Sequence, residues 1–422
     1  MILIFVPEIT PRVEYIFAWI FCEVLGLQMQ LTDDIESFQL DATSIKIEYN
    51  YIPVTNHLFF PCHDFLFEDQ IEKQTIEEIK FANFTALFRP KEAFQPFNID
   101  LFASAFYLIS RFEEYLPCIK DIHNRYLPEQ SVAFRFNFLE KAMVNRYIDA
   151  IQDYLCANNP QFIKKNIQAQ SLYTIDIDHA FYAKNVSLEK FLKRNLLNLF
   201  HSEEKDKYDT YDFIYNTLNE NKVAHKTFLL CPQHPHKNDH FNKREDKAFV
   251  ELVKILNHKT DLNIHPSYNS LSQKNLLEEE KNWLEVKINK KIESNRFHFL
   301  RFDIESFYST ILLKNKIKAD FSMAYGGYAG FRTSTSLPFY FFDLSKNKKT
   351  SLKIFTPCFM DSTFEYYATS EEEKYIQANA SYQSLQDEIR RFGGIFMPIF
   401  HNDLMAKKEW KSIFEQSIKS AP

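Results

Sequence analysis

Short apolar runs alternate with amphipathic segments through the second half of the chain. The apolar runs predict strands, which fall at residues 171–176, 227–232, 261–266, 297–302, 318–325, 337–344, 352–359 and 393–400. Segments whose apolar residues recur every three or four positions predict helices, at 187–200, 211–220, 244–257, 277–286, 305–315 and 371–391. Strands that alternate with helices are typical of parallel strands joined by helical crossovers. This number of them predicts a distorted (β/α) barrel of about seven strands.

The first part of the chain predicts a separate mixed α/β arrangement. Strands are expected at 1–8 and 44–51, and helices at 11–26 and 100–116. The last of these helices carries Arg111, Glu113 and Glu114, which we interpret as a solvated helix face with local ion pairs, a functional site being the alternative. With the boundary near 156–166, we expect an N-terminal α/β domain at 1–165, to which no role is assigned, and the barrel at 166–422.

Composition narrows the class of protein. The 422 residues are 45% hydrophobic and 25% charged, with a net charge of −6, which is typical of a globular protein and argues against a nucleic-acid partner. The six cysteines include no C-x-x-C pair, so we expect neither a zinc knuckle nor a disulfide framework. Every apolar run is shorter than a membrane span and the N-terminal run lacks a basic start. We therefore expect a cytoplasmic protein with no membrane span.

An acidic pair, Asp176 and Asp178, stands at the end of the first strand of the predicted barrel. Side chains alternate along a strand, so both carboxylates point to the same side as Thr174. Like charges this close repel unless a cation lies between them or one carboxylate holds a proton. A bound metal ion is the commonest way to relieve this repulsion. The structural alternative is that the two carboxylates cap the segment that follows the strand.

Other polar residues follow the remaining predicted strands, at His265, Arg296, His298, Asp320 and His401. The active face of such a barrel lies at the carboxyl ends of its strands, so we expect most of these side chains at one mouth. Structural alternatives stay open: a turn histidine at His265, a helix N-terminal residue at His401, and a structural ion pair between Arg296 and Asp320.

Five motifs follow in order: TIDID (174–178), HPSYN (265–269), RFHF (296–299), DFSMAYGGYAGFR (320–332) and IFHN (399–402). In this order they resemble the motifs of the NodB-type polysaccharide deacetylases, carbohydrate esterase family 4, over residues 171 to 405. More closely, the chain looks like the intracellular branch found beside exopolysaccharide genes, whose N-terminal half carries a segment similar to FYLISRFEEY (106–115). The resemblance implies a NodB-like barrel and a saccharide or polysaccharide substrate, with biosynthetic proteins as partners.

The resemblance also implies catalytic roles. Asp176 matches the general base and His401 the general acid, while Arg296 matches the arginine that holds the base, with Asp320 as its partner. Amide hydrolysis needs such a set, because water must be activated, the developing oxyanion stabilised and the departing amine protonated.

For the metal, the resemblance implies that Asp178 and His265 are ligands of a divalent cation, zinc in the first place, with cobalt, nickel or manganese as alternatives. The family's second metal histidine is replaced by Asn269, a poor zinc ligand. The family's proline in the arginine motif is replaced by His298, which on a strand would project to the same side as Arg296. We hypothesise that His298 completes the ligand set. His179 is the competing candidate, although it should face away from Asp178.

Two more stretches invite interpretation. The glycine-rich loop at 326–330 is ringed by Tyr325, Tyr328 and Phe331, for which we predict a sugar subsite, with core anchors as the alternative. The histidine-rich stretch 234–240 is predicted to be a polar loop rather than a metal cluster, because its spacing fixes no ligand geometry.

The sequence thus favours a metal-dependent hydrolase that removes N-acetyl, or else O-acetyl, groups from a saccharide in exopolysaccharide biosynthesis. One alternative is a catalytically impaired sugar-binding or scaffold protein, which Asn269 favours. Another is a glycosyltransferase whose D-x-D motif binds a nucleotide-held cation. The N-terminal part has only Gly26 and so lacks a glycine-rich phosphate turn, which argues against the glycosyltransferase.

Overall fold

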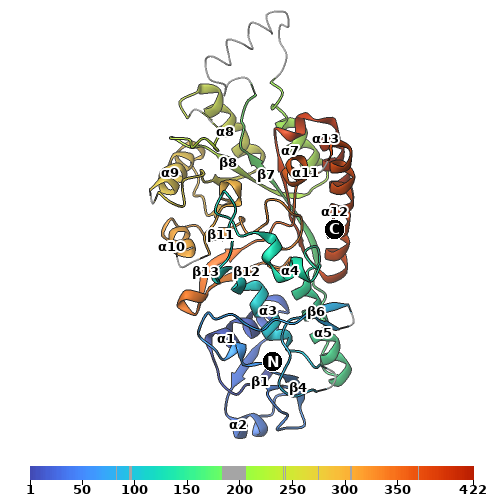
Figure 1. The fold of residues 1–422 in the computed structure, drawn as a ribbon. Helices are drawn as coiled ribbons and strands as arrows, with labels where there is room; N and C mark the ends of the chain where they lie inside the picture. The colour runs from blue at the N-terminus through green and yellow to red at the C-terminus, as the bar shows by residue number, and fades with distance from the viewer. Residues whose placement is uncertain are drawn as a thin grey trace, which may run out of the picture.

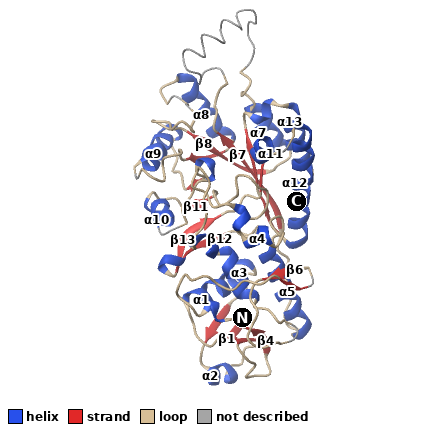
Figure 2. Ribbon diagram, viewed as in Figure 1, coloured by secondary structure: helices blue, strands red, loops and turns tan. Residues whose placement is uncertain are grey.

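The computed structural model describes residues 1–422 apart from positions 82, 95, 96, 183–205, 241, 243, 274, 305, 306 and 369. The molecule is elongated, with the N-terminal sheet at one end and a larger sheet at the other (Figure 1). Helices lie on the outside of both sheets, as the colouring by secondary structure shows (Figure 2). The helix expected at 187–200 lies outside the described residues.

The N-terminal sheet has four parallel strands in the order β2-β1-β3-β4. Its strands are β1 (Ile2–Phe5), β2 (Met29–Thr32), β3 (Ile45–Asn50) and β4 (Leu58–Pro61). A separate hairpin pairs β5 (Ile79–Phe81) with β6 (Phe84–Ala86). The helices are α1 (Pro11–Phe17), followed by a π-helical turn at Ala18–Val24, α2 (Ile35–Leu40), α3 (Leu101–Ile109), α4 (Val132–Arg135) and α5 (Met143–Asn158). The expected strands and helices of this part are confirmed.

The larger sheet runs in the order β12-β13-β11-β10-β9-β8-β7-β16-β14, with β15 paired to β7. All pairings are parallel except that of β12 with β13. The strands are β7 (Ala169–Ile177), β8 (Ala224–Leu230), β9 (Asp261–His265), β10 (Ser294–Asn295), β11 (Ala319–Asp320), β12 (Phe339–Asp343), β13 (Lys348–Ile354), β14 (Phe359–Met360), β15 (Gly394–Phe396) and β16 (Pro398–His401).

Helices flank this sheet. They are α7 (Tyr211–Glu220), α8 (Lys247–Lys259), α9 (Leu276–Ile288), α10 (Phe307–Lys314), α11 (Asp361–Tyr367), α12 (Glu371–Phe392) and α13 (Lys408–Lys419). Five match predicted helices, whereas α11 and α13 were not predicted from the sequence. The alternation of parallel strands and crossover helices is therefore confirmed.

The barrel itself is not confirmed. Among the described residues the sheet is an open path that ends at β12 and β14, and no pairing joins these two strands. Its outer strand β12 is antiparallel to β13, and β10, β11 and β14 are only two residues long. The strand expected at 297–302 is wrong, because the chain forms a 3-10 turn at His298–Leu300 in which Phe299 and Leu300 have φ values of 61° and 52°.

The two halves of the chain are joined by a buried ionic network. Arg332, from the loop before β12, donates to both carboxylate oxygens of Glu114 at 2.9 and 2.7 Å. Arg111 donates to Glu114 at 2.8 Å and to Glu113 at 2.9 Å, and all four side chains are buried. Our interpretation of Arg111, Glu113 and Glu114 as a solvated helix face is therefore wrong, because the helix end is covered by Arg332.

Apolar and polar contacts extend this junction. Tyr15 of α1 donates to the carbonyl of Tyr340 at 2.7 Å, and its ring lies 5.0 Å from that of Phe342. Trp19 donates to the carbonyl of Pro338 at 3.1 Å. One hydrophobic core cluster contains residues from both halves. The division at residue 165 stays a prediction.

Among the described helices, none combines the length and the apolar character that crossing a bilayer requires.

Candidate functional site

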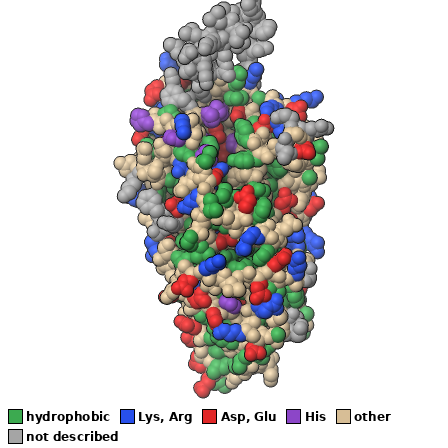
Figure 3. Space-filling model, in the orientation of Figure 1, with side chains coloured by type: hydrophobic (Ala, Val, Ile, Leu, Met, Phe, Trp, Pro, Cys, Tyr) green, Lys and Arg blue, Asp and Glu red, His purple; other side chains and the backbone are tan. Residues whose placement is uncertain are grey.

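A cavity of about 320 Å³ lies at the carboxyl ends of β7, β9 and β16, beside the turn that follows β10. Its lining includes six of the polar residues discussed for this mouth: Asp176, Asp178, His179, His265, His298 and His401. Histidine side chains also gather on the upper half of the molecular face in Figure 3. The parallel sheet thus brings together side chains that are up to 225 positions apart, since 401 − 176 = 225.

Asp178, His265 and His298 form a compact cluster. Nε2 of His265 is 3.2 Å from Oδ1 of Asp178, and Nε2 of His298 is 3.4 Å from Oδ2 of the same carboxylate. One ligand atom from each residue lies within 4.8 Å of the others, as a shared metal ion requires. Asn269 is not among the residues that line the cavity, and its carbonyl accepts hydrogen bonds from Ser272 and Gln273 in a turn.

The far nitrogen of each histidine is held by a hydrogen bond. Nδ1 of His265 donates to the carbonyl of Arg296 at 2.5 Å, because a carbonyl can only accept. Nδ1 of His298 lies 2.8 Å from Oδ1 of Asp239. Asp239 also accepts the backbone N–H groups of His236 and Tyr268, both at 2.9 Å. Such outer partners are the usual means by which proteins orient metal-binding imidazoles.

This arrangement is suited to a cation. Once Nδ1 of His265 carries the proton, Nε2 of a neutral imidazole presents a lone pair toward Asp178. Oδ1 of Asp178 is itself buried and has no hydrogen-bond partner. Burial raises the pKa of Asp178, but the nearby His298 outweighs it and holds that pKa well below its usual range. Two lone pairs facing each other in a buried site fit a divalent metal ion, which carboxylate and imidazole ligands both bind.

Asp176 is held by Arg296. Nη1 of Arg296 donates to Oδ1 of Asp176 at 2.5 Å, and Nη2 donates to Thr174 at 2.8 Å. The guanidinium also lies over the ring of Phe228, 4.4 Å from its centroid, and is fully buried. Oδ2 of Asp176 lies 3.9 Å from Nε2 of His265. One carboxylate oxygen is therefore fixed by the arginine while the other faces the cluster.

Asp320 lies behind this pair. Its carboxylate accepts the backbone N–H of Ser322 at 3.0 Å and the hydroxyl of Ser322 at 2.8 Å. Burial lowers the pKa of Arg296, and the charges of Asp176 and Asp320 act in the opposite direction. Asp320 is not among the residues that line the cavity, so its influence on the site passes through Arg296.

His401 lies on the other side of Asp178 and has its own carboxylate partner. Its Nδ1 is 2.5 Å from Oδ1 of Asp361, and its backbone N–H donates to Oδ2 at 2.7 Å. Nε2 lies 3.9 Å from Oδ2 of Asp178. Burial lowers the pKa of His401, but Asp361, its hydrogen bond and the other carboxylates raise it, to about 10. The imidazole is therefore protonated at neutral pH and can donate a proton.

Sequence reasoning missed several residues of this site. Asp361 begins α11 and Asp239 falls in the stretch 234–240, which we had set aside as a polar loop. That loop in fact borders the cavity through His240, whose ring stacks on that of His179 with centroids 3.1 Å apart. The position of Asp361 after an apolar run was the only available signal, since its contact with His401 spans 40 residues.

The three aromatic residues of the glycine-rich loop lie in different surroundings. Tyr325 is buried, and its hydroxyl accepts from Arg111 at 3.2 Å. Phe331 is fully buried in the hydrophobic core. Tyr328 is exposed and donates to Oε1 of Glu129 at 2.8 Å. Only Tyr328 of the three therefore presents much of its ring to solvent.

Part of the chain matches a known family, and part of it is similar to solved structures. A family of unknown function, DUF7033, matches residues 2–160. No curated protein matches the chain. Among solved structures, a protein from Mycobacterium smegmatis assigned as a polysaccharide deacetylase is similar at 10% identity and a TM-score of 0.38, over 61% of this chain and 85% of that one.

Two further structures are similar to the same degree. The polysaccharide deacetylase Bc1974 from Bacillus cereus has 10% identity and a TM-score of 0.33, over 60% of this chain and 87% of that one. A family 4 carbohydrate esterase from Streptomyces lividans, in complex with acetate, has 9% identity and a TM-score of 0.28, over 60% and 90%. Similarity at this level does not assign a function to the chain.

Proposed function

We propose that this protein is a metal-dependent hydrolase that removes an acetyl group from an acetylated saccharide, an N-acetyl group in the first place. The observation that carries the proposal is the buried oxygen of Asp178, which lacks a hydrogen-bond partner and faces Nε2 of His265. A carboxylate and two imidazoles, each imidazole held from behind, are a ligand set that suits zinc, with cobalt, nickel or manganese as alternatives.

The residues around the cluster fit the needs of amide hydrolysis. A divalent ion at Asp178, His265 and His298 would make a bound water more acidic and polarise the acyl carbonyl. Asp176 accepts the proton of the attacking water through the oxygen that Arg296 leaves exposed to the cluster. Arg296 orients this carboxylate, because its buried guanidinium donates a hydrogen bond to Asp176.

His401 supplies the proton that the departing amine needs. Its Nε2 faces the same carboxylate of Asp178 from another direction, at 3.9 Å, so base and acid flank the reacting carbon on different sides. Asp361 and the other carboxylates raise the pKa of His401 and so favour the protonated imidazole. A departing amine needs this proton, and the resemblance of the motifs places N-acetyl before O-acetyl substrates. The link to exopolysaccharide biosynthesis rests on the resemblance of the motifs.

Release of acetate tests the proposal. The zinc-loaded protein is incubated with N-acetylated and O-acetylated saccharides, and acetate and free amine are measured together. We expect equal amounts of both from an N-acetylated saccharide, inhibition by a chelator, and recovery when zinc is added back. Asp176→Asn should abolish release. A protein that binds zinc tightly but releases acetate from none of the glycans would instead be a sugar-binding protein or a scaffold.

A further inference from the structure

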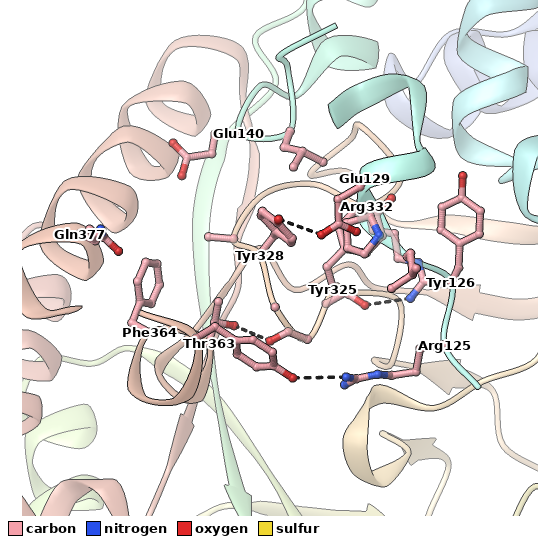
Figure 4. Close-up of a pocket in the computed structure, with 18 of the residues that line it drawn as sticks. Arg125, Tyr126, Glu129, Glu140, Tyr325, Tyr328, Arg332, Thr363, Phe364 and Gln377 are labelled. Atoms are coloured by element: carbon pink, nitrogen blue, oxygen red, sulfur yellow. Dashed lines mark hydrogen bonds between the residues drawn. The ribbon is translucent and has the colours of Figure 1, made fainter. Parts of the chain in front are cut away.

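A second and larger hollow adjoins the catalytic cavity. It measures about 890 Å³ and lies between residues 121–146 of the N-terminal half, the loop at 324–332, and helices α11 and α12. Arg125, Gly326 and Tyr367 line both spaces, so the hollow lies directly beside the cavity. Figure 4 shows Glu129, Tyr328 and Arg125 on one side, with Phe364 and Gln377 facing them from α11 and α12.

The lining combines exposed rings with polar groups. Tyr328 is 37% exposed and Tyr367 is 58% exposed, and both hydroxyls are already engaged, by Glu129 and Arg125 respectively. Engaged hydroxyls hold the rings in place and leave their faces available. Rings that offer flat apolar surface beside hydrogen-bonding groups suit pyranose sugars, which have an apolar face and a rim of hydroxyls.

Charge in the hollow is balanced. Its basic residues are Arg125, Lys141, Arg146 and Arg332, and its acidic residues are Asp121, Glu129, Glu140 and Glu388. Three of the arginines are paired locally, Arg125 with Asp121 at 2.8 Å, Arg146 with Glu388 at 2.5 Å, and Arg332 with Glu114 at 2.7 Å. A polyanion or a polycation would find no surplus of opposite charge here. A neutral, hydroxyl-rich polymer fits better.

Contacts between segments that are far apart in the sequence hold the walls of the hollow together. Phe331 donates its backbone N–H to the carbonyl of Leu139 at 2.7 Å, which joins the loop at 324–332 to the N-terminal half. At Gly330, where φ is 126°, an added Cβ would lie 2.4 Å from the carbonyl oxygen of Leu139, so only glycine admits this close approach. The hollow is therefore preformed, and a ligand would bind without first ordering its walls.

We propose that this hollow binds the sugar residues of an oligosaccharide or polysaccharide that flank the reacting sugar, with residues 121–146 as one wall. The substrate is then a glycan chain rather than a single sugar. The identity of the reacting acetyl group rests on the function proposed above, whereas chain binding in the hollow does not require that activity. The N-terminal half thereby gains a role in holding the polymer.

Binding of glycans of increasing length tests this inference. The zinc-loaded Asp176→Asn protein is titrated calorimetrically with β-1,4-linked and β-1,6-linked N-acetylglucosamine oligomers of one to six sugars. We expect the affinity for at least one linkage to rise about tenfold or more between one and four sugars. Tyr328→Ala should remove most of that gain, whereas Tyr328→Phe, which keeps the ring, should preserve it. Ile376→Ala is the matched control on α12, because Ile376 is 64% exposed but lies outside the hollow.

The outcomes separate this inference from the proposed function. Affinity that does not change with length for either linkage, or an unchanged gain in Tyr328→Ala, would overturn the chain-binding role even if acetate is released. Length-dependent binding that Tyr328→Ala removes would support it even if the wild-type protein releases no acetate. With Asp176 intact, the ratio of kcat/KM for six sugars to that for two should also be lower in Tyr328→Ala than in wild type.

Discussion

Asp361→Asn is expected to change the protonation of His401. Asparagine keeps the size of the side chain and one acceptor oxygen, but it loses the second acceptor, which receives the backbone N–H of His401, and it removes the charge 2.5 Å from Nδ1. The pKa of His401 is raised from 6.5 to about 10, and at about 1.4 kcal/mol per pH unit this favours the protonated imidazole by roughly 5 kcal/mol. Without Asp361, burial lowers the pKa, and we expect a fall of more than about 2 pH units.

Nuclear magnetic resonance of histidine-labelled, zinc-free protein measures this pKa directly. Wild-type His401 should titrate near pH 10 and the variant well below it, and the alkaline limb of the kcat profile should move in the same direction. Asp387→Asn is a suitable control, because Asp387 is an exposed carboxylate paired with Arg390. A wild-type His401 that titrates near 6.5, or profiles that coincide in Asp361→Asn and wild type, would refute the reasoning.

The same substitution should also change how the unfolding free energy depends on pH. A folded-state pKa raised above the unfolded value contributes stability that is fully present below pH 6.5 and is lost as pH rises through about 10. The difference in unfolding free energy between wild type and Asp361→Asn should therefore be largest below pH 6.5 and shrink toward pH 10. Urea unfolding at several pH values measures it, and a difference that grows with pH would contradict the assignment.

Two further predictions concern the acidic residues. Asp176→Asn should abolish turnover but retain bound zinc, whereas Asp178→Asn should lose the metal; equal metal loss in both, measured by elemental content, would mean that the two roles are exchanged. Glu114→Gln should lower the unfolding free energy by about 3 kcal/mol, because it leaves the buried guanidinium groups of Arg332 and Arg111 short of a counter-charge. Urea unfolding checks this, and a change below about 1 kcal/mol would show that the network contributes little stability.

Periodicity was sufficient to find most elements of the fold, since apolar spacing in a strand or helix is a local property. It failed at residues 297–302, where apolar residues that look like a strand form a turn through the positive φ values of Phe299 and Leu300. His298 nevertheless lies beside Asp178. The assumption that His298 is on a strand was therefore wrong, although its side chain does reach Asp178 from the turn. Sheet closure could not be read from the sequence either, because it depends on how far short strands such as β10 and β11 continue the ladder.

Contacts between residues far apart in the sequence were the other feature that the sequence could not predict. Positions at strand ends were predictable, because parallel strands bring their carboxyl ends to one edge. The partners that stand behind them were not: Asp239 and His298 are 59 positions apart, and Glu114 and Arg332 are 218 apart. No local pattern distinguishes a carboxylate that will be buried against such a partner from one that faces water.

The most direct test of the central claim is a competitive zinc titration of four proteins: wild type, His298→Ala, Asp239→Asn and Asn269→Ala. Wild type should bind one zinc ion per chain. His298→Ala should bind at least about 100-fold more weakly and Asp239→Asn about 10-fold to 100-fold more weakly, as the loss of a ligand and of its outer partner implies. Asn269→Ala should match wild type. Unchanged stoichiometry and affinity in His298→Ala would contradict the proposed metal site.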